Sequence, residues 1–137
     1  MNPNDIIVRI IQEHYPAVQG VYLFGTYATA DEWPDSDVDI AMLLPPHEAS
    51  QQPQLMLTPC HDALADALER PVDLLNAREV STVFQNQIVQ SGRLLYTGDE
   101  YAVAEFEMLT LSLYQKLNEE RAGILEAFQA TGKAYAP

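Results

Sequence analysis

Two aspartates separated by one residue stand at the start of an apolar segment, where their chemistry is unusual. Asp37 and Asp39 open the stretch DVDIAMLL. Alternation along a strand would point both carboxylates to one face, with Cα atoms about 7 Å apart. Two such anions repel each other, and burying them is costly unless a cation or hydrogen-bond donors compensate. The pair therefore predicts a divalent metal site, although D-x-D alone fits equally well a turn residue followed by an exposed strand residue.

A Gly-Thr pair, Gly25 and Thr26, ends the preceding apolar run AVQGVYLF. A strand that delivers this pair to a helix would present backbone N–H groups and a hydroxyl, which together suit a phosphate. By itself FGT after a strand is more often an ordinary turn. The pair is also not part of a Walker loop, because G-x-x-x-x-G-K-[ST] occurs nowhere in the chain.

The elements that must position these residues can be read from apolar periodicity and turn residues. Asn2 as a helix cap, Pro3 at the first helical position and Gly92 as a stop mark the helix ends. The alternation predicts an α/β or α+β fold, a small mixed β-sheet flanked by helices. Strands are expected at 17–24, 37–44, 70–77 and 93–98, and helices at 2–15, 55–69, 81–92 and 99–131.

Size and charge restrict the class of protein. The 137 residues suit a single domain, 1–137, with a core of about 1–98 and a C-terminal helix of about 99–131. One cysteine, Cys60, excludes an internal disulfide framework, and no secretory leader or membrane-spanning run is expected, so we predict a cytoplasmic protein. With 20 acidic and 7 basic residues, direct binding to nucleic acid or membrane is disfavoured and a basic protein partner is favoured.

The last predicted helix carries an apolar stripe with two interpretations. Val103, Phe106, Leu109, Leu113, Leu117, Ile124 and Phe128 recur at mixed spacings of three and four. The stripe either packs on the protein's own sheet or, in part, docks a partner. Elsewhere, the neighbours Cys60 and His61 would point about 100° apart on a helix, which predicts a buried cysteine and an exposed histidine.

Taken together, the two motifs resemble a family signature. Gly25-Thr26, ten residues, and then Asp37-Val38-Asp39 is similar to the G-[ST]-x(10)-D-x-D pattern of minimal nucleotidyltransferases, a branch of the polymerase-beta-like nucleotidyltransferase superfamily. The segments LFGT, SDVDIAML, RPVDLLNA and IVQSGRLLY also follow the family's order, over most of residues 20 to 98. The resemblance implies that family's fold and a third carboxylate at Asp73, which periodicity alone would assign to a solvent-facing strand position.

The resemblance also implies a reaction, the transfer of AMP from ATP. Asp37, Asp39 and Asp73 would be catalytic and would bind two Mg²⁺ ions, with Asp73 also the general base, while Gly25 and Thr26 would hold the triphosphate. Thr26 replaces the commoner serine. The family often has basic residues after this pair, and here YATADEWPDS has none, which leaves Arg9, Arg70 and Arg78 as candidates to face the phosphates.

The partner implied by the resemblance is a HEPN-domain ribonuclease toxin. The chain would be the antitoxin of a type VII-like toxin-antitoxin pair, forming a hetero-oligomer and adenylylating a tyrosine of the toxin. Two alternatives stay open: a non-catalytic antitoxin that acts by occlusion, or an aminoglycoside-type nucleotidyltransferase, for which residues 99–137 are too short to form the usual substrate domain.

Overall fold

The computed structural model describes residues 2–25 and 37–131, and the side chains through residue 126. Helices and strands alternate along this chain, and none of the helices in these ranges is long and apolar enough to cross a membrane. The elements are α1 (Pro3–His14), β1 (Gly20–Phe24), β2 (Val38–Leu43), α2 (Pro46–Gln51), α3 (Pro59–Leu68), β3 (Val72–Asn76), α4 (Thr82–Ser91), β4 (Arg93–Thr97) and α5 (Glu100–Thr131).

The four strands form one mixed sheet in the order β3-β2-β1-β4. β1 pairs antiparallel with β2 and with β4, whereas β2 and β3 are parallel and are connected through α2 and α3. The predicted small mixed sheet with flanking helices is confirmed, and so is the long C-terminal helix.

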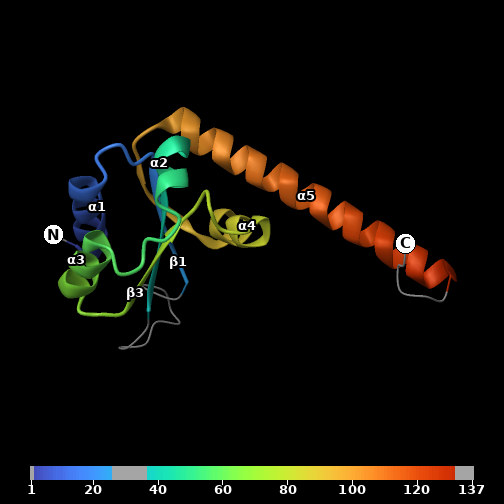
Figure 1. The fold of residues 1–137 in the computed structure, drawn as a ribbon, viewed down its shortest axis with the longest axis horizontal. Helices are drawn as coiled ribbons and strands as arrows, with labels where there is room; N and C mark the ends of the chain where they lie inside the picture. The colour runs from blue at the N-terminus through green and yellow to red at the C-terminus, as the bar shows by residue number, and fades with distance from the viewer. Residues whose placement is uncertain (1, 26–36, 132–137) are drawn as a thin grey trace.

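Helices cover both faces of the sheet, with α1 and α3 on one side and α4 with the first part of α5 on the other (Figure 1). Strand alternation divides the core accordingly. Val21 and Leu23 of β1 pack toward α1 and α3, while Tyr22 and Phe24 pack toward α4 and α5. Every second residue of β2 and β3 therefore faces the α4 side, and Asp39 and Asp73 are among them.

Local sequence explains where the helices begin. Asn2, Thr58 and Ser81 each cap a helix by accepting a hydrogen bond from a backbone N–H three residues on. The helix expected at 55–69 begins only at Pro59, because proline is well suited to the first turn and Thr58 caps it. The sequence did not predict α2, whose six residues lie in a polar stretch with no apolar periodicity.

α5 packs on the sheet only through its first turns. Val103, Phe106 and Thr110 are buried, whereas Leu109 and Leu113 of the predicted stripe are 49% and 51% exposed. Beyond them the helix projects past α4 and away from the body (Figure 1). The packing interpretation of the stripe therefore holds for its N-terminal part, and partner docking stays a prediction for the remainder.

A partly buried hydrogen bond joins this helix to the centre of the sheet. The hydroxyl of Tyr22, on β1, donates to Glu107 Oε2 of α5 at 2.7 Å. The Tyr22 ring also lies 6.3 Å from that of Phe106. Burial and the nearby Glu107 carboxylate raise the pKa of Tyr22, so the phenol stays protonated and remains a donor.

We expect Tyr22→Phe to lower the free energy of unfolding by about 1 to 2 kcal/mol, because it leaves a partly buried carboxylate without its donor. Urea unfolding of the whole chain measures this. Tyr101→Phe is the matched control, since Tyr101 lies on α5, the helix that carries Glu107, and is 78% exposed. Equal stability of the two variants would show that this bond does not hold α5 to the sheet.

Candidate active site

Three aspartates lie at the same end of the sheet. Asp39 on β2 is the direct partner of Asp73 on the parallel strand β3, and on its other side it pairs with Phe24, the last residue of β1. Asp37 is exposed and lies one residue before β2. Because Val38 and Ile40 pack into the α1 and α3 layer, Asp39 and Asp73 face the α4 side.

Gly25 follows β1 and lies against the Asp39 carboxylate. Its φ is +79°, a backbone conformation that residues other than glycine rarely adopt. A Cβ built at this position would overlap Asp39 Oδ2 and lie 3.1 Å from its carboxyl carbon. Glycine is therefore required here for two independent reasons, backbone conformation and the space that Asp39 occupies.

The carboxylates influence one another's protonation. The pKa of Asp39 is raised to about 6, first by burial and then by the negative charges of Asp73 and Asp37. A carboxyl group in this environment binds a proton or a cation more readily than an ordinary surface aspartate does. The repulsion predicted from the sequence is thus present in the folded protein.

The same donor set fits magnesium, which prefers hard oxygen ligands. Among the residues that the structure describes, no group of three or more His, Cys, Asp or Glu side chains is already arranged to hold a metal ion. This arrangement is compatible with magnesium, because that ion usually binds through one or two carboxylates and takes its other ligands from substrate phosphates and water. Metal binding by Asp37, Asp39 and Asp73 stays a prediction.

Other predicted site residues have different outcomes. Thr26 lies outside the described residues. Arg78 as a phosphate ligand is wrong: its guanidinium donates to Leu44 O and Gln19 Oε1, beyond the end of β1 and β2 opposite to Asp39. Arg9 lies 4.0 Å from Glu13 on α1, on the other side of the sheet. Arg70 precedes β3 by two residues and so remains the candidate nearest in sequence to Asp73.

The prediction that His61 is exposed is also wrong. Its ring bridges from α3 to β3, where Nε2 lies 2.9 Å from Val72 O, and Nδ1 accepts from the Leu57 N–H at 3.2 Å. Sequence reasoning missed this role because the Val72 carbonyl belongs to the open edge of β3, and that edge exists only in the folded sheet. The signal available was a histidine in the first turn of a helix just before an edge strand.

An aromatic contact that sequence reasoning also missed supports the Gly25 end of β1. Phe24 packs edge to face on Phe84 of α4, with ring centroids 5.8 Å apart and an interplanar angle of 84°. Neither motif contains Phe84. The first turn of α4 therefore supports the strand end that positions Gly25.

A mixed sheet with clustered carboxylates beside a glycine turn defines a nucleotidyltransferase of the polymerase beta class. The chain belongs to the family described as Polymerase beta, Nucleotidyltransferase, whose profile matches residues 6–101. It is 34% identical over 136 residues to Protein adenylyltransferase MntA of Shewanella oneidensis strain MR-1, covering 99% of this chain and 94% of the relative.

Solved structures agree with this assignment. A crystal structure of a toxin-antitoxin with AMP-PNP superimposes with a TM-score of 0.74 at 30% identity, covering 92% of this chain and 98% of that one. A complex of tri-AMPylated Shewanella oneidensis HEPN toxin with MNT antitoxin matches with a TM-score of 0.66 at 30% identity, covering 93% and 96% of the two chains.

We expect Gly25→Ala to reduce nucleotidyl transfer at least ~100-fold, because displacing a reacting group by about 1 Å can have an effect of this size. The added methyl group must displace the Asp39 carboxylate. Transfer of labelled nucleotide from ATP measures the effect. Gly123→Ala on α5 is the matched control, since a Cβ there meets nothing within 4 Å. Full activity of Gly25→Ala would mean that the Asp39 position is not critical.

The raised pKa of Asp39 predicts a specific pH dependence of stability in metal-free buffer. An ordinary aspartate has a pKa of 3.8, and the folded value is about 6, so the native state holds this proton more tightly. The ionised group therefore destabilises the fold increasingly as pH rises from about 4 to 6. Asp39→Asn should be more stable than wild type by roughly 1 kcal/mol at pH 7, allowing for solvent screening, and equally stable near pH 4.

Urea unfolding of both proteins at pH 4, 5.5 and 7 measures this difference. Asp66→Asn, at an exposed position of α3, controls for loss of one negative charge. A difference in unfolding free energy between Asp39→Asn and wild type that did not change with pH would contradict the raised pKa of Asp39.

Proposed function

We propose that this protein is an Mg²⁺-dependent adenylyltransferase that moves AMP from ATP to a tyrosine hydroxyl of a HEPN ribonuclease toxin, and thereby acts as its antitoxin. In this proposal residues 1–137 form one domain in the cytoplasm, with its catalytic core in about 1–98 and the C-terminal helix as an addition. The observation that carries the proposal is the Asp39 carboxylate, held between Gly25 and Asp73 at one end of the sheet.

The relatives narrow the class of acceptor. The protein at 34% identity is a protein adenylyltransferase, and one superimposable complex contains a tri-AMPylated HEPN toxin with its antitoxin. Nearly full coverage of both chains means that the likeness extends beyond the nucleotide-binding core to α5. This extent supports a protein acceptor in preference to a small molecule.

Each site residue has a proposed role in the transfer of AMP from ATP. The backbone at Gly25, together with Thr26, positions the triphosphate, and the acceptor oxygen attacks the α-phosphorus. The bond from that phosphorus to the bridging oxygen of pyrophosphate breaks, and pyrophosphate leaves with that oxygen. Asp73 takes the proton from the acceptor hydroxyl, because its carboxylate lies on the strand beside Asp39.

Asp37, Asp39 and Asp73 would also hold Mg²⁺, as two ions. When bound, the metal supplies positive charge that neutralises the triphosphate and stabilises the departing pyrophosphate. The raised pKa of Asp39 supports this assignment, since a cation relieves the repulsion among the three carboxylates.

The partner forms a hetero-oligomer with this chain. A formal charge of −13 favours a basic protein surface and opposes direct contact with nucleic acid or anionic lipid. The exposed apolar residues of α5 favour a second candidate function, an antitoxin that acts by occlusion without catalysis. An aminoglycoside-type enzyme receives less support, because a single helix follows β4 in the described part of the chain.

We expect Asp39→Asn and Asp73→Asn each to lower AMP transfer at least ~100-fold, since each removes a hard oxygen ligand or the general base. The assay uses α-labelled ATP, Mg²⁺ and the cognate HEPN protein, with Asp66→Asn as the control. Label on an added aminoglycoside and not on the protein would support the small-molecule alternative. Full neutralisation of the toxin by Asp37→Ala, Asp39→Ala would support occlusion.

A further inference from the structure

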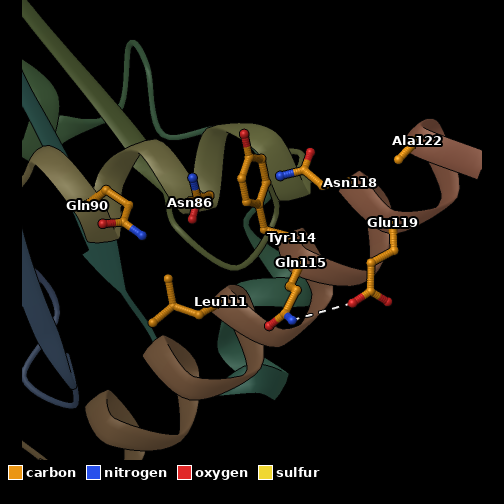
Figure 2. Close-up of a pocket in the computed structure, with 8 residues that line it drawn as sticks. All are labelled: Asn86, Gln90, Leu111, Tyr114, Gln115, Asn118, Glu119 and Ala122. Atoms are coloured by element: carbon orange, nitrogen blue, oxygen red, sulfur yellow. Dashed lines mark hydrogen bonds between the residues drawn. The ribbon is translucent and has the colours of Figure 1, made fainter. Parts of the chain in front are cut away.

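A cleft of about 500 Å³ lies between α4 and α5, and none of the site residues described above belongs to it. Amide side chains dominate its walls, with one tyrosine and one carboxylate (Figure 2). Figure 2 shows Tyr114 reaching from α5 toward α4, with Asn86 and Asn118 on either side of it in this view. The lining amides and carboxylate are Asn86 and Gln90 from α4 and Gln115, Asn118 and Glu119 from α5.

One buried side-chain atom of this cleft has no hydrogen-bond partner among the described residues. The side-chain oxygen of Asn86 is buried and accepts no hydrogen bond from any described residue. Burying an acceptor without a donor costs about 1 to 3 kcal/mol, so such atoms are rare in folded proteins. An incoming donor would satisfy Asn86 Oδ1 without displacing an existing bond.

The remaining walls suit a polypeptide segment. Amide groups offer both donors and acceptors, which matches the alternating N–H and C=O groups of a main chain. Leu111 and Ala122 add small apolar surfaces. Glu119 is exposed, with Oε1 3.4 Å from Gln115 Nε2, and places a negative charge beside the cleft.

The position and charge of the cleft point to the protein acceptor. α4 packs on the same face of the sheet that carries Asp39 and Asp73, and its Phe84 contacts the strand end before Gly25. A segment bound along α4 is therefore attached to the enzyme on the side where AMP is transferred. The charge of −13 favours a segment with basic side chains.

We propose that the α4–α5 cleft binds an extended, basic segment of the HEPN partner, with a main-chain N–H or basic side chain donating to Asn86 Oδ1. This inference rests on the proposed function, because it takes the HEPN protein as the acceptor. The cleft holds the partner while the carboxylates act on its hydroxyl. Its residues therefore determine affinity for the partner and leave ATP binding unaffected.

The first test replaces the unpaired acceptor. Asn86→Leu should weaken binding of the nuclease-inactivated cognate HEPN protein roughly tenfold in calorimetric titration without ATP, the loss equivalent to about 1.4 kcal/mol. Its melting temperature should be no lower than that of wild type, because the buried Oδ1 that the change removes accepts no hydrogen bond in the free protein. Gln87→Leu, an exposed amide on the same helix, is the matched control and should bind normally.

The second test reverses charge. Glu119→Lys should weaken the same binding at least threefold in 50 mM salt and much less in 500 mM, because added salt screens charges beside an exposed cleft. Glu120→Lys changes the net charge equally at the next position of α5, outside the cleft, and should have a smaller effect. In the transfer assay, Asn86→Leu should raise KM for the HEPN protein and leave kcat unchanged.

Wild-type affinity for the HEPN protein in both Asn86→Leu and Glu119→Lys would overturn the inference. Self-association of the wild-type chain that is abolished by Asn86→Leu would also overturn it, because the occupant of the cleft would then be a second copy of this chain. If wild type bound the HEPN protein in the titration but transferred no AMP in the assay, the proposed function would be refuted. The cleft inference would stand, because the titration contains no ATP. Transfer at the normal KM by Asn86→Leu would refute the cleft alone.

Discussion

The close approach of the Asp39 carboxylate to the Gly25 backbone is the constraint on which the rest of the site depends. It follows from the pairing of β1 with β2, which sets Phe24 opposite Asp39 and leaves Gly25 to turn away at positive φ. Parallel pairing then sets Asp73 on the other side of Asp39. A shift of one residue in either register would turn Asp39 or Asp73 to the opposite face of the sheet and separate the cluster.

The two faces of the sheet differ in composition. The α1 and α3 side is an apolar core, while the opposite side holds the carboxylates, α4 and the start of α5. The outer edge of β3 is closed by side chains: the His61 ring lies beside Val72 O, and Leu74 N–H donates to Met56 Sδ at 3.3 Å. Because these contacts flank Asp73, they hold the strand that carries it against movement away from β2.

α5 extends from the side of the sheet that carries Asp39 and Asp73 to an exposed surface beside α4. Its first turns are fixed by Val103, Phe106 and the bond from Tyr22 to Glu107, so the direction of the whole helix follows from the sheet. Farther along, the same helix forms one wall of the cleft that contains the unpaired Asn86 acceptor. One helix therefore connects the side of the sheet that carries Asp39 and Asp73 with this polar cleft.

Sequence alone determined the strands and most helices, because apolar periodicity, capping residues and glycine act locally. The pair Asp37 and Asp39 by itself left open a metal site or a turn residue followed by an exposed strand residue, and its spacing from Gly25 indicated a site only through the family resemblance. Asp73 required the family resemblance, since periodicity assigned it to solvent, and only the β2–β3 register brings it beside Asp39. Tertiary structure alone decided that Arg78 serves the opposite end of the sheet, that His61 closes the edge of β3, and that α4 and α5 enclose a polar cleft. These features join residues far apart in the chain, and no local pattern in a single sequence records which strand edges and helix faces will meet.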